Sequence, residues 1–124
     1  EGDLVTSIDQ SIFAGTALVS VTIPNGVTEI SDFTFSGCYN LKEVKLSNNL
    51  TRIGEMVFTE CTGLTSIVLP DSLTSIDYGA FFACENLADV YYTGSEEEWA
   101  EIGIGVDNEV LLNATIHFNY VPEE

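Results

Sequence analysis

Apolar and polar residues alternate in three short stretches of the chain. The stretches are SVTI at 20–23, EVKL at 43–46 and SIVL at 66–69. A period of two is typical of a β-strand with one buried face, because successive side chains point to opposite sides of a strand. Turn-forming residues follow the stretches, beginning with Pro24 in the first and Pro70 in the third. We therefore predict three strands whose second and fourth residues point inward.

The alternating stretches belong to a longer unit that recurs every 23 residues. Residues 18–40, 41–63 and 64–86 align without gaps. A fixed period of this size is the signature of a solenoid, whose units stack because one unit cannot bury its apolar edge alone. The identical columns are Leu18, Leu41 and Leu64; Thr28, Thr51 and Thr74; Ile30, Ile53 and Ile76; Phe35, Phe58 and Phe81; and Cys38, Cys61 and Cys84.

Each unit contains two further predicted elements. A second extended piece is VTEI at 27–30, LTRI at 50–53 and LTSI at 73–76. The segment DFTFSGC at 32–38, like its equivalents, is too short for a regular helix. We predict a helical or 3₁₀ turn there, which directs Phe35, Phe58 and Phe81 into the core.

The residues on either side of the repeats are predicted to cap the stack. Residues 8–13 match the Ile-to-Phe part of a repeat, so we expect a half-repeat within an N-terminal cap at 1–17. Residues 87–124 are expected to hold a partial repeat and a C-terminal cap. Such covers are needed because an open end exposes core and strand edge. We thus expect 1–124 to be a single domain, with three full repeats at 18–86.

Two elements are predicted within the C-terminal cap. Ser95 and Glu98 have the spacing of a capping box, which predicts a short helix at 96–102 with Trp99 and Ile102 on one side. Residues 114–120 alternate again and predict a final strand. Its inward residues are predicted to be Ile116, Phe118 and Tyr120, and its outward residues Thr115, His117 and Asn119.

The whole unit, LxxIxLPxxLTxIxxxAFxxCxx, resembles the BspA-like (treponemal-type) class of leucine-rich repeat. Residues 64–86 fit it at nearly every marked position. The other units depart mildly, because Ser47 replaces the proline, and Phe33 and Met56 stand where a small residue is expected.

The resemblance implies a mostly β solenoid of the α/β type, wound right-handed. Short parallel strands would line its concave face, and the helical or 3₁₀ turns would lie on its convex side. Members of the family are mostly bacterial surface or secreted proteins, some of which act in adhesion or protein binding. The family offers no catalytic residues to carry over.

Composition and charge narrow the classes of partner. Apolar residues make up 45% of the chain, enough for a core, and 20 acidic against 3 basic residues give a net charge of −17. So negative a surface repels phosphate backbones and anionic lipid, and no apolar run approaches the ~18 residues of a membrane span. We expect a monomer that binds no nucleic acid and does not insert into a membrane.

The three cysteines pose the main chemical question. Their common column favours buried, inert thiols, because free cysteine is among the most buried residue types. Stacked coils lie within disulfide range, but their Cβ vectors run parallel, so bridging Cys61 to Cys38 or Cys84 would need distortion. A zinc site built from all three would lack a fourth ligand. We expect no metal or cofactor.

No other motif indicates an active site. His117 is the only histidine and no motif places a nucleophile near it. Residues 107–109, Asp-Asn-Glu, lack the spacing of a calcium loop. We expect no catalytic residues and no enzymatic activity.

The outward strand positions form the candidate binding surface. Lys45 lies near its centre and has two interpretations: it pairs with Glu43 or Asp89, or it marks a mixed polar and aromatic binding patch. Arg52 is expected on another side, with Glu29 beside it in the same column. The candidate protein-binding residues are Thr22, Glu43, Lys45, Ser66, Val68, Asp89 and Tyr91, with Ser20 beside them.

The sequence therefore favours a non-catalytic protein-interaction module of a secreted or cell-surface bacterial protein, adhesion being one such role. The alternative is a structural spacer that displays or caps a neighbouring domain and has no ligand of its own.

Overall fold

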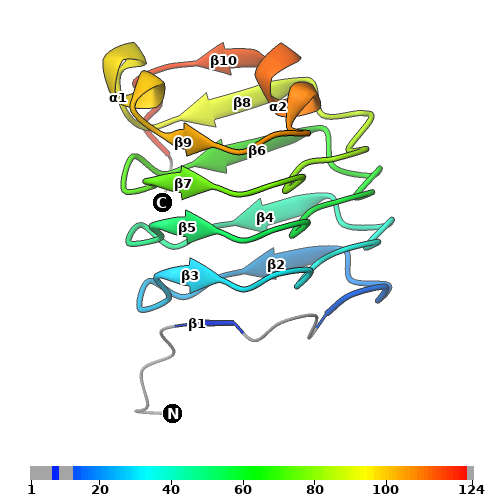
Figure 1. Cartoon of the computed structure of the whole chain (residues 1–124). Coiled ribbons are helices and arrows are strands. Elements are labelled where there is room, and N and C mark those ends of the chain that lie inside the picture. Colours follow the sequence, from blue (N-terminus) through cyan, green and yellow to red (C-terminus); the bar gives the residue numbers. More distant parts are fainter. Residues whose placement is uncertain (1–6, 9–12, 123–124) are drawn as a thin grey trace.

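The computed structural model describes residues 7–8 and 13–122, and in it the chain winds through stacked coils with a layer of parallel strands on each side (Figure 1). One side, the short-strand layer, is a five-stranded sheet in the order β1-β3-β5-β7-β9. Its strands are two residues long. They are β1 (Ser7–Ile8), β3 (Glu29–Ile30), β5 (Arg52–Ile53), β7 (Ser75–Ile76) and β9 (Gly103–Ile104).

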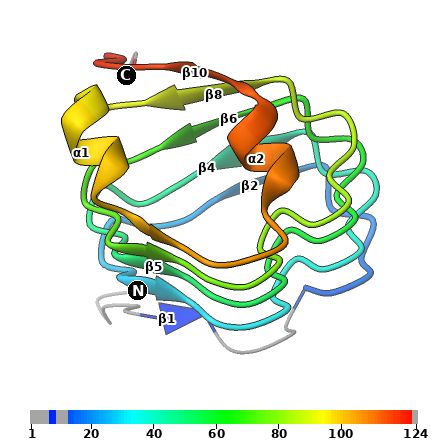
Figure 2. The ribbon, with the colours of Figure 1, turned by 45° about the horizontal axis from the view of Figure 1, so that its top comes forward.

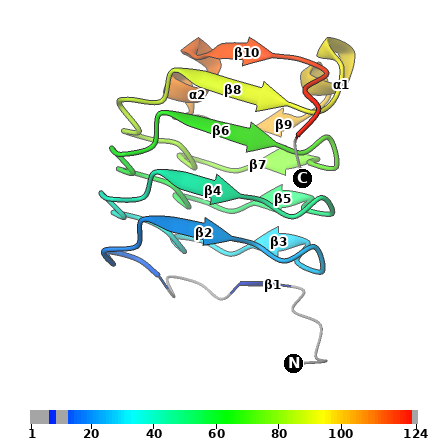
Figure 3. The same ribbon diagram turned by 180° about the vertical axis from the view of Figure 1, so that it is seen from behind.

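The opposite side, the long-strand layer, faces the viewer in Figure 3. Its hydrogen-bonded groups are β2-β4 and β10-β8-β6. No strand pairing joins β4 to β6 in the described part of the chain, so the layer has a seam between them. The strands are β2 (Ser20–Thr22), β4 (Glu43–Lys45), β6 (Ser66–Leu69), β8 (Asp89–Tyr92) and β10 (Thr115–His117).

The register of both layers follows the sequence repeat. Glu29 pairs with Arg52 and Arg52 with Ser75, so each partner lies one repeat further along. Identical columns therefore become stacks inside the core. The rings of Phe35 and Phe58 are stacked with centroids 5.6 Å apart, and those of Phe58 and Phe81 are 5.3 Å apart. All three phenylalanines are fully buried, as predicted.

The segments that follow β3, β5 and β7 contain isolated turns closed by i→i+3 hydrogen bonds, such as Ser36 N–H to the Phe33 carbonyl at 3.0 Å, but no regular 3₁₀ or α-helix. The predicted turn is thus present only as single turns and does not continue as a helix. Each turn contains two residues in the left-handed region of backbone space, which a right-handed helix cannot include. The first column of such residues is Phe33 (φ 64°), Met56 (φ 57°) and Gly79 (φ 60°), and the second is Gly37, Glu60 and Ala83. Because the first column is left-handed, it favours the small residue that Phe33 and Met56 replace.

Besides these local bonds, backbone hydrogen bonds in the turns run from each coil to the next. The N–H groups of Phe35 and Phe58 donate to the carbonyls of Val57 and Ala80 in the following coil, at 3.0 and 2.7 Å. This ladder continues the sheet around the bend. It holds the phenylalanines at the inner wall without a regular helix.

The N-terminal half-repeat fits the observed pairing. β1 pairs with β3, with Ile8 opposite Ile30, and the ring of Phe13 stacks on that of Phe35 at 5.6 Å. The remainder of the predicted N-terminal cap lies largely outside the described residues.

The C-terminal segment adds a longer coil and two short helices at the end of the stack (Figure 2). The helix predicted at 96–102 is observed as the shorter α1 (Glu96–Ala100), with the capping box formed by Ser95 and Glu98, so Ile102 lies beyond its end. Ile102 is buried and Trp99 half-buried against the core, as expected. The sequence pattern did not reveal β9, which extends the short-strand layer, or α2 (Glu109–Asn113).

Asn108 ends the ladder of the turns. Its Oδ1 accepts the Phe81 N–H at 2.9 Å, in the place where a carbonyl of a further coil would stand. Its Nδ2 donates to the carbonyls of Asp77 and Gly105, both at 3.0 Å. The side chain is 1% exposed, so this one amide replaces the backbone of the missing coil.

Candidate functional site

The cysteine column is structural. Cys38, Cys61 and Cys84 are free thiols and fully buried. Each Sγ contacts the carbonyl oxygen of the phenylalanine one coil before it, at 3.1 Å to Phe13, 3.2 Å to Phe35 and 2.7 Å to Phe58. Each thiol therefore donates a hydrogen bond to the wall of the core.

Burial also makes these thiols poor nucleophiles. It raises the pKa of the Cys84 thiol to about 12 and raises the pKa of the Cys61 thiol as well. A thiolate is the reactive form of cysteine, so both groups stay protonated and inert. In the described residues no cluster of three histidine, cysteine, aspartate or glutamate side chains could hold a metal ion.

The predicted binding residues lie together on the long-strand layer. Strand pairing sets Thr22 beside Lys45 and Val68 beside Tyr91. Thr22, Glu43, Lys45 and Ser66 are exposed, whereas Val68, Asp89 and Tyr91 are half-buried. We call this surface the long-strand face.

His117 and Tyr120 add an aromatic cluster to the face. His117 Nε2 lies 3.0 Å from Asp89 Oδ1, and its ring stacks on Tyr91 with centroids 4.5 Å apart. The ring of Tyr120 lies 4.9 Å from that of Tyr91. His117 points outward as predicted, but it is held by these contacts.

The prediction that Tyr120 points inward is wrong. Asn119 has φ 57°, a left-handed conformation that ends the strand alternation. β10 accordingly stops at His117, and Tyr120 contacts Tyr91 on the outer side. Asparagine tolerates this conformation better than most residues, so Asn119 was a signal for the end of the strand. The prediction followed the apolar and polar alternation of 114–120 instead.

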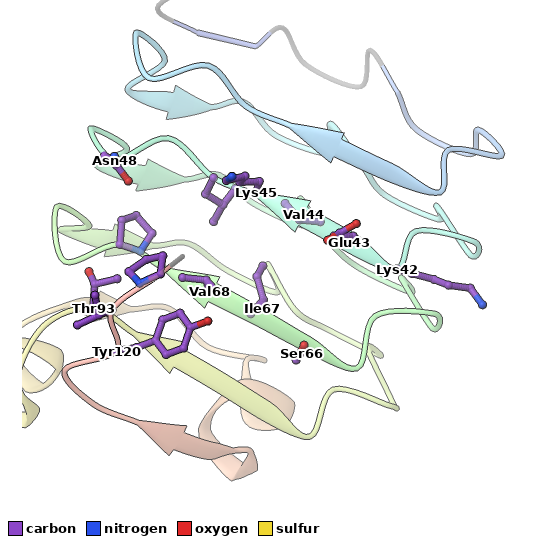
Figure 4. A pocket seen from close by; sticks show the side chains of 14 residues that line it. Lys42, Glu43, Val44, Lys45, Asn48, Ser66, Ile67, Val68, Thr93 and Tyr120 are labelled. Atoms are coloured by element: carbon purple, nitrogen blue, oxygen red, sulfur yellow. The ribbon is translucent and has the colours of Figure 1, made fainter. Parts of the chain in front are cut away.

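A groove of about 520 Å³ runs along the seam between β4 and β6 (Figure 4). Its residues come from β4 and β6 with residues that flank these strands, from Thr93 after β8, and from Tyr120–Pro122, which follows β10. A second groove of about 770 Å³ continues toward Thr22 and the turns at Asn25 and Asn48. Lys45, Leu46, Asn48, Pro70, Thr93 and Pro122 line both grooves.

The two charge predictions had different outcomes. Arg52 lies 3.7 Å from Glu29, as predicted, and also 3.5 Å from Asp32 and 2.7 Å from Asp77. Lys45, in contrast, makes no ion pair with Glu43 or Asp89, and Asp89 contacts His117 instead. Among the described residues, neither Lys42 nor Lys45 has an acidic partner within ion-pair distance.

A family model described as a BspA type leucine rich repeat region, in six copies, matches residues 3–102. The chain belongs to this family. Leucine-rich repeats are generally non-catalytic scaffolds, and such domains generally mediate contacts between proteins. No helix in the described residues is long and apolar enough to cross a membrane.

Three solved structures are similar to this chain. The Treponema pallidum leucine rich repeat protein has 27% identity over 94% of this chain and 64% of its own, with a TM-score of 0.71. A leucine-rich repeat protein from Bacteroides capillosus has 35% identity over 71% of this chain and 63% of its own, with a TM-score of 0.66.

The third is a leucine rich cell surface protein from Faecalibacterium prausnitzii, with 38% identity and a TM-score of 0.61. The match covers 71% of this chain and 25% of that protein. The chain thus spans less than two thirds of each of these proteins. A search among curated proteins found no match.

Proposed function

We propose that the chain is a non-catalytic protein-interaction module of a secreted or cell-surface bacterial protein, and that its long-strand face is the binding surface. The residues proposed to contact the partner are Thr22, Glu43, Lys45, Ser66, Val68, Asp89 and Tyr91. The proposed organisation is one monomeric domain, a right-handed solenoid of three full 23-residue repeats at 18–86 between caps at 1–17 and 87–124.

The observation that carries this proposal is the arrangement of the face itself. Tyr91, His117 and Tyr120 pack into an aromatic cluster beside two grooves, while Lys45 has no ion pair within the part of the chain that the structure describes. Tyrosine is enriched among the residues that dominate interface energies, since it offers a large rigid surface with a polar tip. One F. prausnitzii neighbour is described as a cell surface protein, which supports the proposed location.

The size of the face limits the affinity. Five strands at ~4.8 Å separation span about 20 Å, whereas a standard interface buries ~800 Å² per partner. A partner therefore uses the grooves and the loops at their rim as well as the strands.

Photocrosslinking tests the proposal. A photoreactive amino acid would replace exposed Ser66 on the long-strand face or, as the control, exposed Thr74 next to the short-strand layer. In a bacterial cell-surface extract, position 66 should give a discrete crosslinked protein that is lost in a Tyr91→Ala background. Crosslinks from position 74 alone would mean that the binding surface lies on the short-strand layer. The absence of crosslinks from both positions would favour the alternative function as a structural spacer.

A further inference from the structure

We infer that the groove at the seam binds an extended peptide, with one carboxylate of the peptide against Lys45 and a neighbouring apolar side chain against Tyr120. This inference rests on the proposed function of the long-strand face and names the chemistry of its partner.

The first argument is charge. The chain carries three cations against 20 acids, and two of the three, Lys42 and Lys45, line this one groove. The third, Arg52, is held by three acids on the other layer. An ammonium without an acidic partner is available to a carboxylate of a ligand, where it does not have to break an existing ion pair.

The second argument concerns the number of acidic residues in the peptide, which is limited to one opposite Lys45. Glu43 also lines the groove, and the chain as a whole has a net charge of −17. A densely acidic peptide would be repelled by this field, as would a nucleic acid. A peptide with one carboxylate opposite Lys45 gains the local attraction and avoids most of the repulsion.

The third argument is the apolar wall. Tyr120 is backed by Tyr91 and lies beside Thr93 (Figure 4). Two prolines, Pro70 and Pro122, also line the groove. Proline and packed tyrosine lose little conformational freedom when a ligand binds, so their apolar surface is used at low entropic cost. Val68 lines the groove between this wall and β4.

The fourth argument is length. One side of the groove follows the chain from Lys42 through β4 to Asn48. At ~3.3 Å per extended residue this is roughly 20 Å, which accommodates about six residues of an extended peptide. Since the contact area is small, the peptide is expected to be a minor part of a larger protein contact, or to bind weakly.

Phage-displayed random peptides selected against the whole chain provide the test. Enriched sequences should carry one Asp or Glu beside an aliphatic or aromatic residue. In synthetic versions of these peptides, replacing the acid with its amide should weaken binding about fivefold, the equivalent of ~1 kcal/mol for a partly exposed ion pair.

Variants of the protein locate the contact. Lys45→Gln should cause the same loss of about fivefold, and Lys45→Glu should favour peptides with lysine in place of the acid. Ala17→Glu is the matched control, because it makes the chain more negative by the same one charge as Lys45→Gln at an exposed position away from the groove. The affinity of the Ala17→Glu variant for the selected peptides should equal that of the unmodified chain.

Three results would overturn the inference: no enrichment of acid-containing peptides, an equal loss in Ala17→Glu, or binding that is indifferent to Lys45→Gln. The crosslinking experiment at position 66 does not depend on any of these results. Failure of the peptide hypothesis can therefore be distinguished from failure of the proposal that the long-strand face binds a protein.

Discussion

Arg52 and Lys45 are both basic residues of the second full repeat, but the two strand layers that carry them differ. On the short-strand layer, Arg52 contacts Glu29, Asp32 and Asp77, one from its own layer and two from the adjoining turns. On the long-strand layer, Lys45 has no ion-pair partner among the described residues and lines both grooves. The two layers also differ in backbone pairing. The short-strand layer is one continuous sheet, whereas the long-strand layer has a seam between β4 and β6.

The difference separates side chains that have partners within the fold from those proposed to contact a ligand. On the short-strand side and in its turns, Asn108, Arg52 and the thiols all have partners within the fold. No buried side-chain nitrogen or oxygen in the described residues lacks a hydrogen bond. On the long-strand face, Lys42 and Lys45 have no ion-pair partner among the described residues, and we propose that a ligand uses Lys45. Substitutions on the two sides should accordingly affect stability in one case and binding in the other.

The largest expected effect is on the phenylalanine stack. Phe58→Ala removes the central ring between Phe35 and Phe81, and it should reduce the free energy of unfolding by about 3–5 kcal/mol. Urea denaturation followed by circular dichroism measures this. Phe82→Ala, at a residue 47% exposed, is the control and should change stability little. Equal losses in both variants would mean that the stack is not the stabilising column.

The next effect concerns the end of the turn ladder. Asn108→Ala leaves the Phe81 N–H and the carbonyls of Asp77 and Gly105 without their partner, at a cost of roughly 1–3 kcal/mol. Hydrogen exchange should show faster exchange of the Phe81 amide in particular. Asn40→Ala, at an exposed position, is the comparison. An unchanged Phe81 amide would show that Asn108 does not end the ladder.

The thiols predict a dependence of stability on pH. Burial raises the pKa of Cys84 to about 12 in the folded chain, against ~8.5 for an unfolded cysteine. The protonated thiol therefore contributes stability below about pH 8.5, and this contribution is lost at about 1.4 kcal/mol per pH unit as the pH rises from there toward 12.

Cys84→Ser tests this because serine can still donate to the Phe58 carbonyl but does not ionise in this range. Unfolding free energies between pH 8 and 10 should fall less steeply in the variant than in the unmodified chain. Parallel slopes would contradict a buried, protonated Cys84 thiol.

The smallest effect is the sharpest comparison of the two layers. Arg52→Gln should cost about 1 kcal/mol at low salt and less at high salt, because its pairs are partly exposed. Lys45→Gln should leave the melting temperature unchanged at every salt concentration. A comparable loss in Lys45→Gln would mean that Lys45 has a structural partner and is not free for a ligand.

Much of the architecture followed from the repeat. A period of 23 residues with identical Leu, Ile, Phe and Cys columns specified which residues stack, because a solenoid sets equivalent positions beside each other. Alternation in 43–46 and 66–69 correctly placed Lys45 and Val68 on the outer face. The capping box at Ser95 and Glu98 correctly predicted the start of α1.

Other features depended on groups distant in sequence. The turns after β3, β5 and β7 were predicted to be helical or 3₁₀ turns. The left-handed conformation within them was not foreseen, because Met56 and Glu60 are residue types that seldom adopt it. Hydrogen bonds to the next coil stabilise it there, and these are not visible in a local pattern. Asn108 was not recognised as a cap for the same reason, because its three partners belong to Phe81, Asp77 and Gly105.

The sequence by itself determined the period, the core columns and the strand faces, because these depend on side-chain periodicity, which is local and repeated. Only the tertiary structure decided where the layer opens into a groove, which acid each cation meets and that Tyr120 joins the outer face. Those outcomes depend on the relative positions of side chains from different coils. Asp89 illustrates this, since its partner is His117 of the final strand and not Lys45.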